Sequence, residues 1–203
     1  MFHVKHSDWD AWNASRETFK RLEAFVAVLE RWSSRINLIS RNDMSLIWER
    51  HILDSLQLAT MMPPDLCRAT DLGSGAGFPG LILAIATGIP FDLVESDHRK
   101  AAFLREAARV TAATVTVHAT RVETARIAKA SLVTARALAP LPRLLPLAAS
   151  VLAPGGTCLF LKGAQAQAEL DEARQHWHME VRTYPSRTSA DATILEIREL
   201  RHV

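Results

Sequence analysis

Apolar side chains in the first sixty residues recur mostly every three or four positions, which is the period of an α-helix with one broad hydrophobic face. Between residues 8 and 33 these positions are Trp9, Trp12, Phe19, Leu22, Phe25, Val26, Leu29 and Trp32. A second helical stretch is predicted from a cap at Asn42 or Asp43 to the Pro63-Pro64 pair, which ends it. The pattern therefore predicts a helical extension over residues 1–65.

From residue 66 the pattern changes to short β-like runs that alternate with helical segments. Strands are predicted at 67–71, 91–95, 114–118, 131–135 and 157–161, and helices at 79–87, 98–111, 122–128, 139–152 and 164–175. Such alternation favours a mostly parallel sheet with helices on both faces. The last two runs, 176–184 and 192–198, are joined by a segment too short for a crossover helix, which predicts an antiparallel hairpin. Residues 66–203 are thus expected to form one seven-stranded α/β domain.

A glycine-dense turn follows the first predicted strand, with the sequence Asp71-Leu72-Gly73-Ser74-Gly75-Ala76-Gly77-Phe78-Pro79-Gly80. Glycine has no Cβ and tolerates positive φ, so the backbone here can approach a ligand closely. A helix that begins near Pro79 would also direct its free N–H groups towards a carboxylate or phosphate. The turn therefore predicts a nucleotide-type binding site.

Two cofactor classes fit this turn. Gly75, Gly77 and Gly80 match the dinucleotide fingerprint G-x-G-x-x-G, but that pattern makes no use of Asp71 or Gly73. Taken whole, Asp-x-Gly-x-Gly-x-Gly resembles motif I of the class I methyltransferases that use S-adenosylmethionine. The terminal hairpin is also typical of that Rossmann-like fold, and it independently favours the methyltransferase interpretation.

Further candidate residues follow the other predicted strands, where open α/β sheets place their ligands. Glu95 is positioned to accept the hydroxyl groups of a ribose, which both cofactor classes contain. Val122 and Glu123 could meet an adenine edge. Arg136 could bind a carboxylate or phosphate bidentately, or could instead form a structural ion pair with Asp71 or Glu95. Lys162 ends the fifth strand in a similar place.

A further group, Arg50, His51, Asp54 and Ser55, lies in the extension, and the last three share one helix face. A His-Asp pair can act as a general base or can simply satisfy a buried imidazole. From the sequence alone the structural role is favoured.

Composition narrows the class of protein but does not name a partner. The 203 residues are 48% hydrophobic and 23% charged with a formal net charge of +2, which is ordinary for a globular protein and only weak evidence for nucleic-acid binding. No apolar run could span a bilayer and no signal peptide is evident, so a cytoplasmic protein without a membrane partner is expected. Cys67 and Cys158 lie in strand-like contexts, which favours buried thiols over a disulfide or a metal site.

Missing motifs limit the chemistry. Amino-group methyltransferases carry an Asn/Asp-Pro-Pro-aromatic segment after the fourth strand, where this chain has Ala135-Arg136-Ala137-Leu138-Ala139-Pro140. Pyrimidine C5 methylation needs a cysteine nucleophile, usually in a Pro-Cys pair, and neither cysteine follows a proline. The methyl acceptor that remains is a ring nitrogen with its own lone pair. Its methylation requires mainly alignment of the nitrogen with the methyl donor.

Together these segments resemble one family, the small-subunit ribosomal RNA methyltransferase G family, also called glucose-inhibited division protein B. The resemblance is carried by Asn37-Leu38-Ile39-Ser40, Arg50-His51-x-x-Asp54-Ser55, the glycine turn, Arg121-Val122-Glu123, Arg136-Ala137 and Lys162-Gly163. It implies methylation of N7 of guanosine 527, in the 530 loop of 16S rRNA, within the 30S subunit or a precursor particle.

The same resemblance implies S-adenosylmethionine as cofactor, S-adenosylhomocysteine as product and no metal. It places Gly73, Phe78, Val122, Glu123 and Arg136 at the cofactor. The turn and the second strand themselves add the candidates Asp71, Gly75, Gly77 and Glu95. Arg136 would position the reactants rather than transfer a proton, and Arg50, His51 and Lys162 are candidates for substrate contact.

Three alternatives are retained. The chain could be a methyltransferase of the same fold acting on another RNA, a protein or a small molecule, with the extension as a substrate lid. The dinucleotide fingerprint allows a nicotinamide-dependent oxidoreductase. A non-enzymatic RNA-binding module is the third possibility, and the intact glycine turn with Glu95 argues against it.

Overall fold

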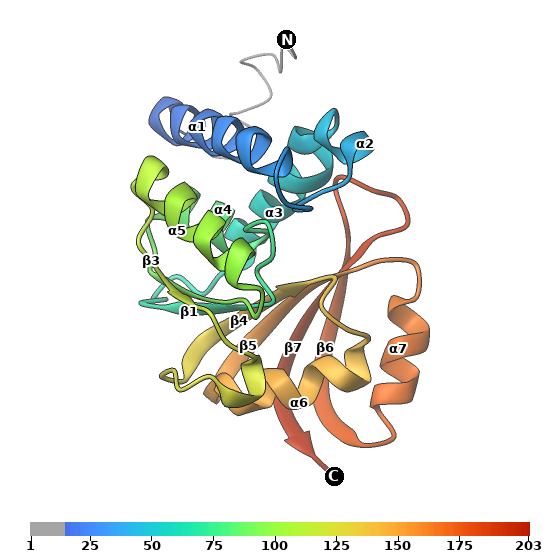
Figure 1. Cartoon of the computed structure of the whole chain (residues 1–203). Helices are drawn as coiled ribbons and strands as arrows, with labels where there is room; N and C mark the ends of the chain where they lie inside the picture. Colours follow the sequence, from blue (N-terminus) through green and yellow to red (C-terminus); the bar gives the residue numbers. More distant parts are fainter. Residues whose placement is uncertain (1–14) are drawn as a thin grey trace.

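The computed structural model describes residues 15–203, and Figure 1 shows a central twisted sheet between two layers of helices. The strands are β1 Ala69–Leu72, β2 Phe91–Val94, β3 Val115–His118, β4 Ala130–Arg136, β5 Leu152–Lys162, β6 Trp177–Pro185 and β7 Thr193–His202. The helices of the α/β part are α4 Gly80–Thr87, α5 His98–Thr111, the 3-10 turn η5 Val122–Thr124, α6 Leu141–Val151 and α7 Ala166–Ala173. Those of the extension are α1 Arg16–Ser33, α2 Arg41–Met44, the π-helical turn η3 Trp48–Leu53, α3 Asp54–Leu56 and the 3-10 turn η4 Gln57–Met61.

The seven strands form one sheet in the order β3-β2-β1-β4-β5-β7-β6. Strands β1 to β5 are parallel, whereas β7 runs antiparallel between β5 and β6. The predicted mostly parallel sheet with a terminal antiparallel hairpin is therefore confirmed. The strand order reverses between β1 and β4, and open sheets of this kind bind ligands in the crevice at such a point.

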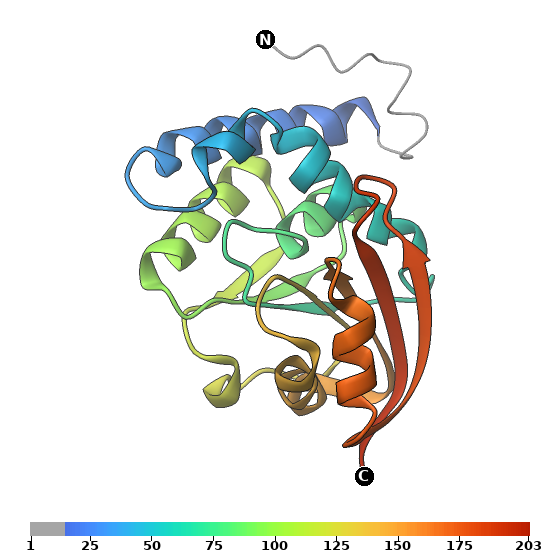
Figure 2. The same ribbon diagram turned by 90° about the vertical axis from the view of Figure 1, so that its right-hand side faces the viewer.

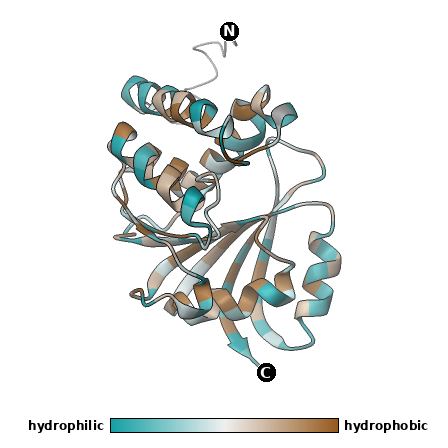
Figure 3. Cartoon of the chain, in the orientation of Figure 1, coloured by the Kyte–Doolittle hydropathy of each residue, from teal (hydrophilic) through white to brown (hydrophobic). Residues whose placement is uncertain are grey.

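Each face of the sheet carries its own hydrophobic core. Leu93, Leu132 and Leu159 pack with α4, α5 and the extension on one face. Val133 and Phe160 pack with α6 and α7 on the other. In Figure 3 the central strands are largely brown and α7 is largely teal, as expected for strands covered on both faces and a helix exposed on one.

The extension packs on the α4–α5 layer, and both views show α1 lying across these helices (Figures 1 and 2). Phe25 of α1 meets Phe78 and Phe103 edge-on, at centroid distances of 5.6 Å and 6.2 Å. The Arg21 guanidinium donates to the Thr111 and Ala112 carbonyl oxygens at the end of α5. The extension and the sheet domain therefore share one core. The predicted helix over 8–33 is observed from Arg16, and Trp9 and Trp12 lie outside the described residues.

The second helical stretch differs from its prediction, because it is broken into four short pieces and Ser40, not Asn42 or Asp43, caps α2. Where η3 passes into α3, the backbone N–H of Asp54 bonds to the His51 carbonyl. In the same turn the Arg50 carbonyl accepts a hydrogen bond from the Arg136 side chain of β4 at 3.1 Å. The irregular stretch is therefore also a contact with the sheet.

Two smaller predictions are wrong. The helix expected over 122–128 is only the turn η5, after which the chain extends so that Ala125 and Ile127 pack on the core beneath. Cys67 is exposed and precedes β1, whereas Cys158 is buried in β5, where burial raises the pKa of its thiol to about 12. Among residues 15–203 no helix is long and apolar enough to cross a bilayer.

Candidate active site

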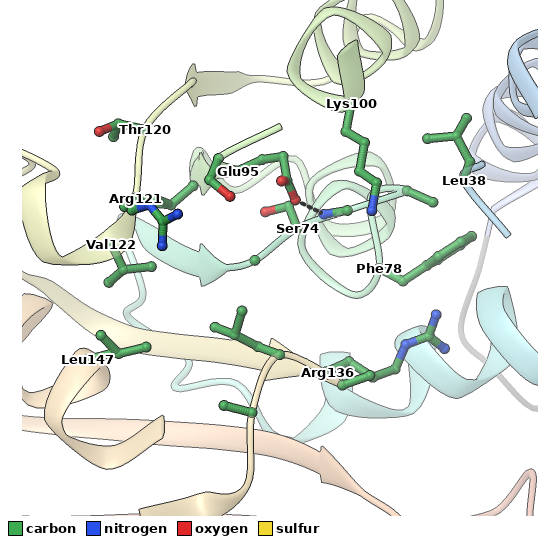
Figure 4. A pocket seen from close by; sticks show the side chains of 18 of the residues that line it. Leu38, Ser74, Phe78, Glu95, Lys100, Thr120, Arg121, Val122, Arg136 and Leu147 are labelled. Carbon is green, nitrogen blue, oxygen red and sulfur yellow. Dashed lines mark hydrogen bonds between the residues drawn. The ribbon is translucent and has the colours of Figure 1, made fainter. Parts of the chain in front are cut away.

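A cavity of about 590 Å³ opens at the carboxyl ends of β1, β2 and β4, where the strand order reverses. Residues of the extension close one end of it, and Figure 4 shows Glu95 near its middle with Phe78 and Arg136 towards that end. The volume is within the ~300–1,000 Å³ typical of small-molecule sites. The predicted site residues that line it are His51, Gly73, Gly75, Phe78, Glu95, Val122, Glu123 and Arg136.

The glycine turn forms one wall of this cavity. Gly73, Gly75 and Gly77 have φ values of +66°, +53° and +91°, which side chains other than glycine rarely adopt. A Cβ on Gly73 would lie 2.5 Å from Cδ1 of Leu138, so the turn also packs closely against the segment after β4. Gly77 does not line the cavity and lies instead against the core side chains Leu81 and Phe25.

Gly80, the third glycine of the dinucleotide fingerprint, is required for another reason. A Cβ there would collide with the Asp71 side chain, so glycine lets α4 begin directly against the end of β1. Gly80 therefore matches the dinucleotide pattern, but the reason that glycine is needed there is packing inside the protein.

Asp71 lies beneath the turn, fully buried, and not on the cavity wall. Its Oδ1 accepts from the Thr134 hydroxyl at 2.7 Å, while Oδ2 has no partner of good hydrogen-bond geometry. Burial raises the pKa of Asp71 to about 6, although the nearby Ser74 hydroxyl, Thr134 hydroxyl and Gly80 N–H oppose the shift. The Asp71 carboxyl thus lies under the turn, and its direct contact with the cofactor stays a prediction.

Glu95 is nearly buried and holds the turn in place. Its Oε2 accepts from the Gly75 N–H and its Oε1 from the Asp97 N–H, both at 2.8 Å. Each carboxylate oxygen retains a second lone pair, so the group can still accept hydrogen bonds from a diol in the cavity.

Arg136 is bound by one turn of the extension. Its Nη1 donates to the Arg50 carbonyl and to Asp54 Oδ2 at 3.2 Å, and its Nη2 lies 2.6 Å from His51 Nδ1. The ion-pair partner is thus Asp54, and the pairing with Asp71 or Glu95 considered from the sequence is wrong. Burial lowers the pKa of Arg136 from its ordinary value, and Asp54 opposes that shift.

Arg136, His51 and Phe78 form a stacked group at this end of the cavity. The guanidinium carbon lies 4.8 Å from the centre of the Phe78 ring, and the His51 ring stacks on it at 4.9 Å. Burial, followed by the charge of Arg136, lowers the pKa of His51 to about 4. His51 is therefore neutral, and its Nδ1 is the acceptor for Arg136. Its buried Nε2 carries the proton and has no hydrogen-bond partner among residues 15–203.

The remaining candidates from the sequence lie beside this cavity. Lys162 lines a neighbouring cavity of about 540 Å³ that shares the 136–139 wall, and its ammonium group is held by Glu169 at 2.6 Å and by the Ala139 carbonyl at 3.0 Å. The Arg50 side chain is mostly exposed and pairs with Asp43 at 3.0 Å. Neither residue lines the main cavity.

Several lining residues were not identified from the sequence as site residues. Asp43 was considered only as a helix cap, and the segment around Leu138 only for its missing motif. These side chains come from separate elements, so local spacing carried no signal for them. Further lining side chains of this kind include Arg143 and Leu147.

No cluster of three or more His, Cys, Asp or Glu side chains suited to a metal ion occurs among residues 15–203. The cavity walls supply the backbone of the glycine turn, the Glu95 carboxylate near the middle and the apolar side chains of Val122 and Leu147.

The chain is similar to known proteins at the level of sequence and of fold. The model of the rRNA small subunit methyltransferase G family matches residues 18–195. Ribosomal RNA small subunit methyltransferase G from Gluconobacter oxydans is 54% identical over 189 residues, covering 93% of this chain and 97% of the relative. That from Acidiphilium cryptum is 56% identical over 190 residues, covering 92% and 88%.

Among solved structures, the O-methyltransferase from Bacillus cereus in complex with SAH has the same fold with a TM-score of 0.58. It is 11% identical, and the match covers 87% of this chain and 91% of that one. The class I methyltransferase fold predicted from the sequence is therefore confirmed. The family match over most of the chain and this fold lead to one conclusion, that the chain belongs to the rRNA small subunit methyltransferase G family.

Proposed function

We propose that this chain transfers a methyl group from S-adenosylmethionine to N7 of guanosine 527 in the 530 loop of 16S rRNA, within the 30S subunit or a precursor particle. The observation that carries this proposal is the single cavity in which the glycine turn, Glu95 and Arg136 meet at the reversal of strand order. Such a substrate would place the reaction in the cytoplasm.

The residues fit a nucleoside cofactor. Positive φ at Gly73 and Gly75 leaves open backbone at the cavity wall. Glu95 would accept the ribose hydroxyls, and Val122 and Glu123 would face the adenine. Phe78 and Arg136 would lie at the methionine end, close to the reacting methyl group. When bound, S-adenosylmethionine supplies a methyl group activated by a sulfonium centre.

The chain's own contribution to the reaction is alignment. N7 of guanine has a lone pair and carries no proton in neutral guanine, so its methylation requires no general base. Neutral His51 and the paired Arg136 form a rigid surface against which a base can be held, and Arg136 acts here as a positioning residue. Arg50 is paired with Asp43, and Lys162 is paired with Glu169. Through these ion pairs, Arg50 and Lys162 would help to shape the surface that meets the substrate.

The decisive experiment is methyl transfer from labelled S-adenosylmethionine to 30S subunits that lack the modification, followed by mapping of the methylated atom. We expect one methyl group per particle at N7 of guanosine 527. A product at another base, or transfer only to a protein or small molecule, would support the alternative that this fold acts on another substrate. Calorimetric binding of NADH without binding of S-adenosylhomocysteine would instead favour the oxidoreductase.

A further inference from the structure

Asp43 places a carboxylate at the end of the cavity that the extension closes. The same end is lined by His51, Phe78 and Arg136. The Asp43 side chain lines this cavity and is 28% exposed, and its charge acts on both His51 and Arg136. A carboxylate here lies on the opposite side from Val122 and Leu147, where the adenine of the cofactor is proposed to bind.

The carboxylate is ionised and fixed in orientation. Ser40 Oγ donates to its Oδ2 at 2.6 Å and Arg50 Nη1 to its Oδ1 at 3.0 Å. These bonds, with that from Ser40 the larger cause, hold the pKa of Asp43 below its usual range. A carboxylate has about four lone-pair sites, so two remain available for a ligand.

Guanine presents two neighbouring donors, N1–H and the N2 amino group, on its Watson–Crick edge. Adenine has an acceptor at N1, and inosine lacks the N2 amino group. Enzymes that act on an extruded base commonly read this edge, and the attacking N7 lies on the other, Hoogsteen, edge. We propose that Asp43 is the guanine-specificity residue and accepts both donors bidentately while N7 faces the methyl group; this inference rests on the proposed function.

The reaction makes this contact stronger as it proceeds. The N7 lone pair forms the new bond to carbon while the sulfur–methyl bond breaks and its electron pair stays on sulfur. Positive charge thus moves from the sulfonium to the purine ring, and N1–H becomes a better donor. A fixed carboxylate on that edge binds the transition state more tightly than the neutral base.

The test uses 30S subunits rebuilt with guanosine or inosine at the target position. Wild type and Asp43→Asn are compared by kcat/KM on both substrates and by the Kd of S-adenosylhomocysteine. The matched control is Asp171→Asn, which removes an exposed carboxylate of α7 that pairs with Arg174 at 3.5 Å, away from the cavity. Melting temperatures are measured for all three proteins.

Wild type is expected to prefer guanosine by about 10- to 100-fold, the size of one hydrogen bond to a charged group. Asp43→Asn should lower kcat/KM on guanosine by a similar factor and reduce the preference to about threefold or less, since an amide cannot accept both donors. Its Kd for S-adenosylhomocysteine should change by less than about twofold, and the control should match wild type.

Three results would overturn the inference. If wild type methylates inosine as well as guanosine, there is no contact with the N2 amino group, and this result needs no variant. An Asp43→Asn protein that keeps the full preference excludes this residue. A loss of S-adenosylhomocysteine affinity equal to the loss of kcat/KM would assign Asp43 to the cofactor. Failure of wild type to methylate N7 is a separate result, which overturns the proposed function and this inference together.

Discussion

Arg136 has a structural role, and we propose a second role for it in positioning the reactants. Its guanidinium binds a carbonyl, a carboxylate and an imidazole on one turn of the extension, and it lies over the Phe78 ring. Five N–H donors in a planar fork allow this, and three hydrogen bonds leave donors for a ligand.

Replacing Arg136 by Lys separates the two roles. Lysine keeps the charge but cannot reach three partners at once, so we expect methyl transfer to fall about 10- to 100-fold. Asp54→Asn is the comparison, because it weakens the same ion pair and keeps the guanidinium. If both variants lose activity only in proportion to their melting temperatures, Arg136 is a structural residue alone.

His51 predicts a pH dependence of stability. Its folded pKa of about 4 lies below the ordinary value of 6.5, so the unfolded chain binds the extra proton more readily. Stability from this group is therefore complete above about pH 6.5 and is lost as the pH falls towards 4, by about 1–3 kcal/mol for a partly open ring. His51→Gln retains an acceptor for Arg136 without this titration.

The measurement is the melting temperature of both proteins between pH 4 and 7. As the pH is lowered, the melting temperature of wild type should fall more than that of His51→Gln. Asp71 titrates nearby with a raised pKa, which acts in the opposite direction and is common to both proteins, so only their difference is interpreted. A constant difference across this range would show that His51 does not titrate as the structure implies.

At the scale of elements, the turn between β1 and α4 depends on backbone conformation. Gly73→Ala places a Cβ at φ +66° and 2.5 Å from Leu138, which should cost about 1–2 kcal/mol and displace the segment after β4. We expect at least about tenfold weaker binding of S-adenosylhomocysteine by calorimetry. Gly163→Ala is the control, because nothing lies within 4 Å of its Cβ position. Equal affinities in the two variants would remove this turn from the site.

The elements also differ in how far the sequence predicts them. The parallel strands and α5 follow local periodicity and caps, and Asp97 caps α5 through the Arg99 and Lys100 N–H groups. The region from Trp48 to Met61 does not, because its hydrogen bonds are partly made with β4. Helical periodicity there could not show where the backbone bonding changes.

At the scale of the whole molecule, the extension and the sheet domain share a core. Leu22 and Ile52 from the extension belong to the same buried cluster as Leu81 and Phe103. The boundary at residue 65 remains a prediction from sequence. The continuous core leads us to expect one cooperative unfolding transition, in which tryptophan fluorescence and far-ultraviolet circular dichroism coincide. Two separated transitions would show that residues 1–65 and 66–203 fold as independent units.

The turn between β6 and β7 joins the same assembly from the far end of the chain. Thr188 donates to Asp54 Oδ1 at 2.8 Å, and the Arg187 N–H donates to Gln57 Oε1 at 2.9 Å. Asp54 thereby links the extension, β4 through Arg136 and the terminal hairpin. The end of the cavity that faces the proposed substrate is thus built by three segments distant in sequence.

The sequence by itself determined the change of period at residue 66, the parallel strands, the terminal hairpin and the glycine turn, because each follows from the local spacing of apolar residues or from backbone freedom at glycine. It also indicated part of the cavity wall, since parallel strands end at one edge. Only the tertiary structure decided that Arg136 pairs with Asp54, that Asp71 lies beneath the turn and that Asp43 lines the cavity. These depend on which elements meet across the fold, and hydrogen-bonding partners far apart in sequence leave no trace in local periodicity.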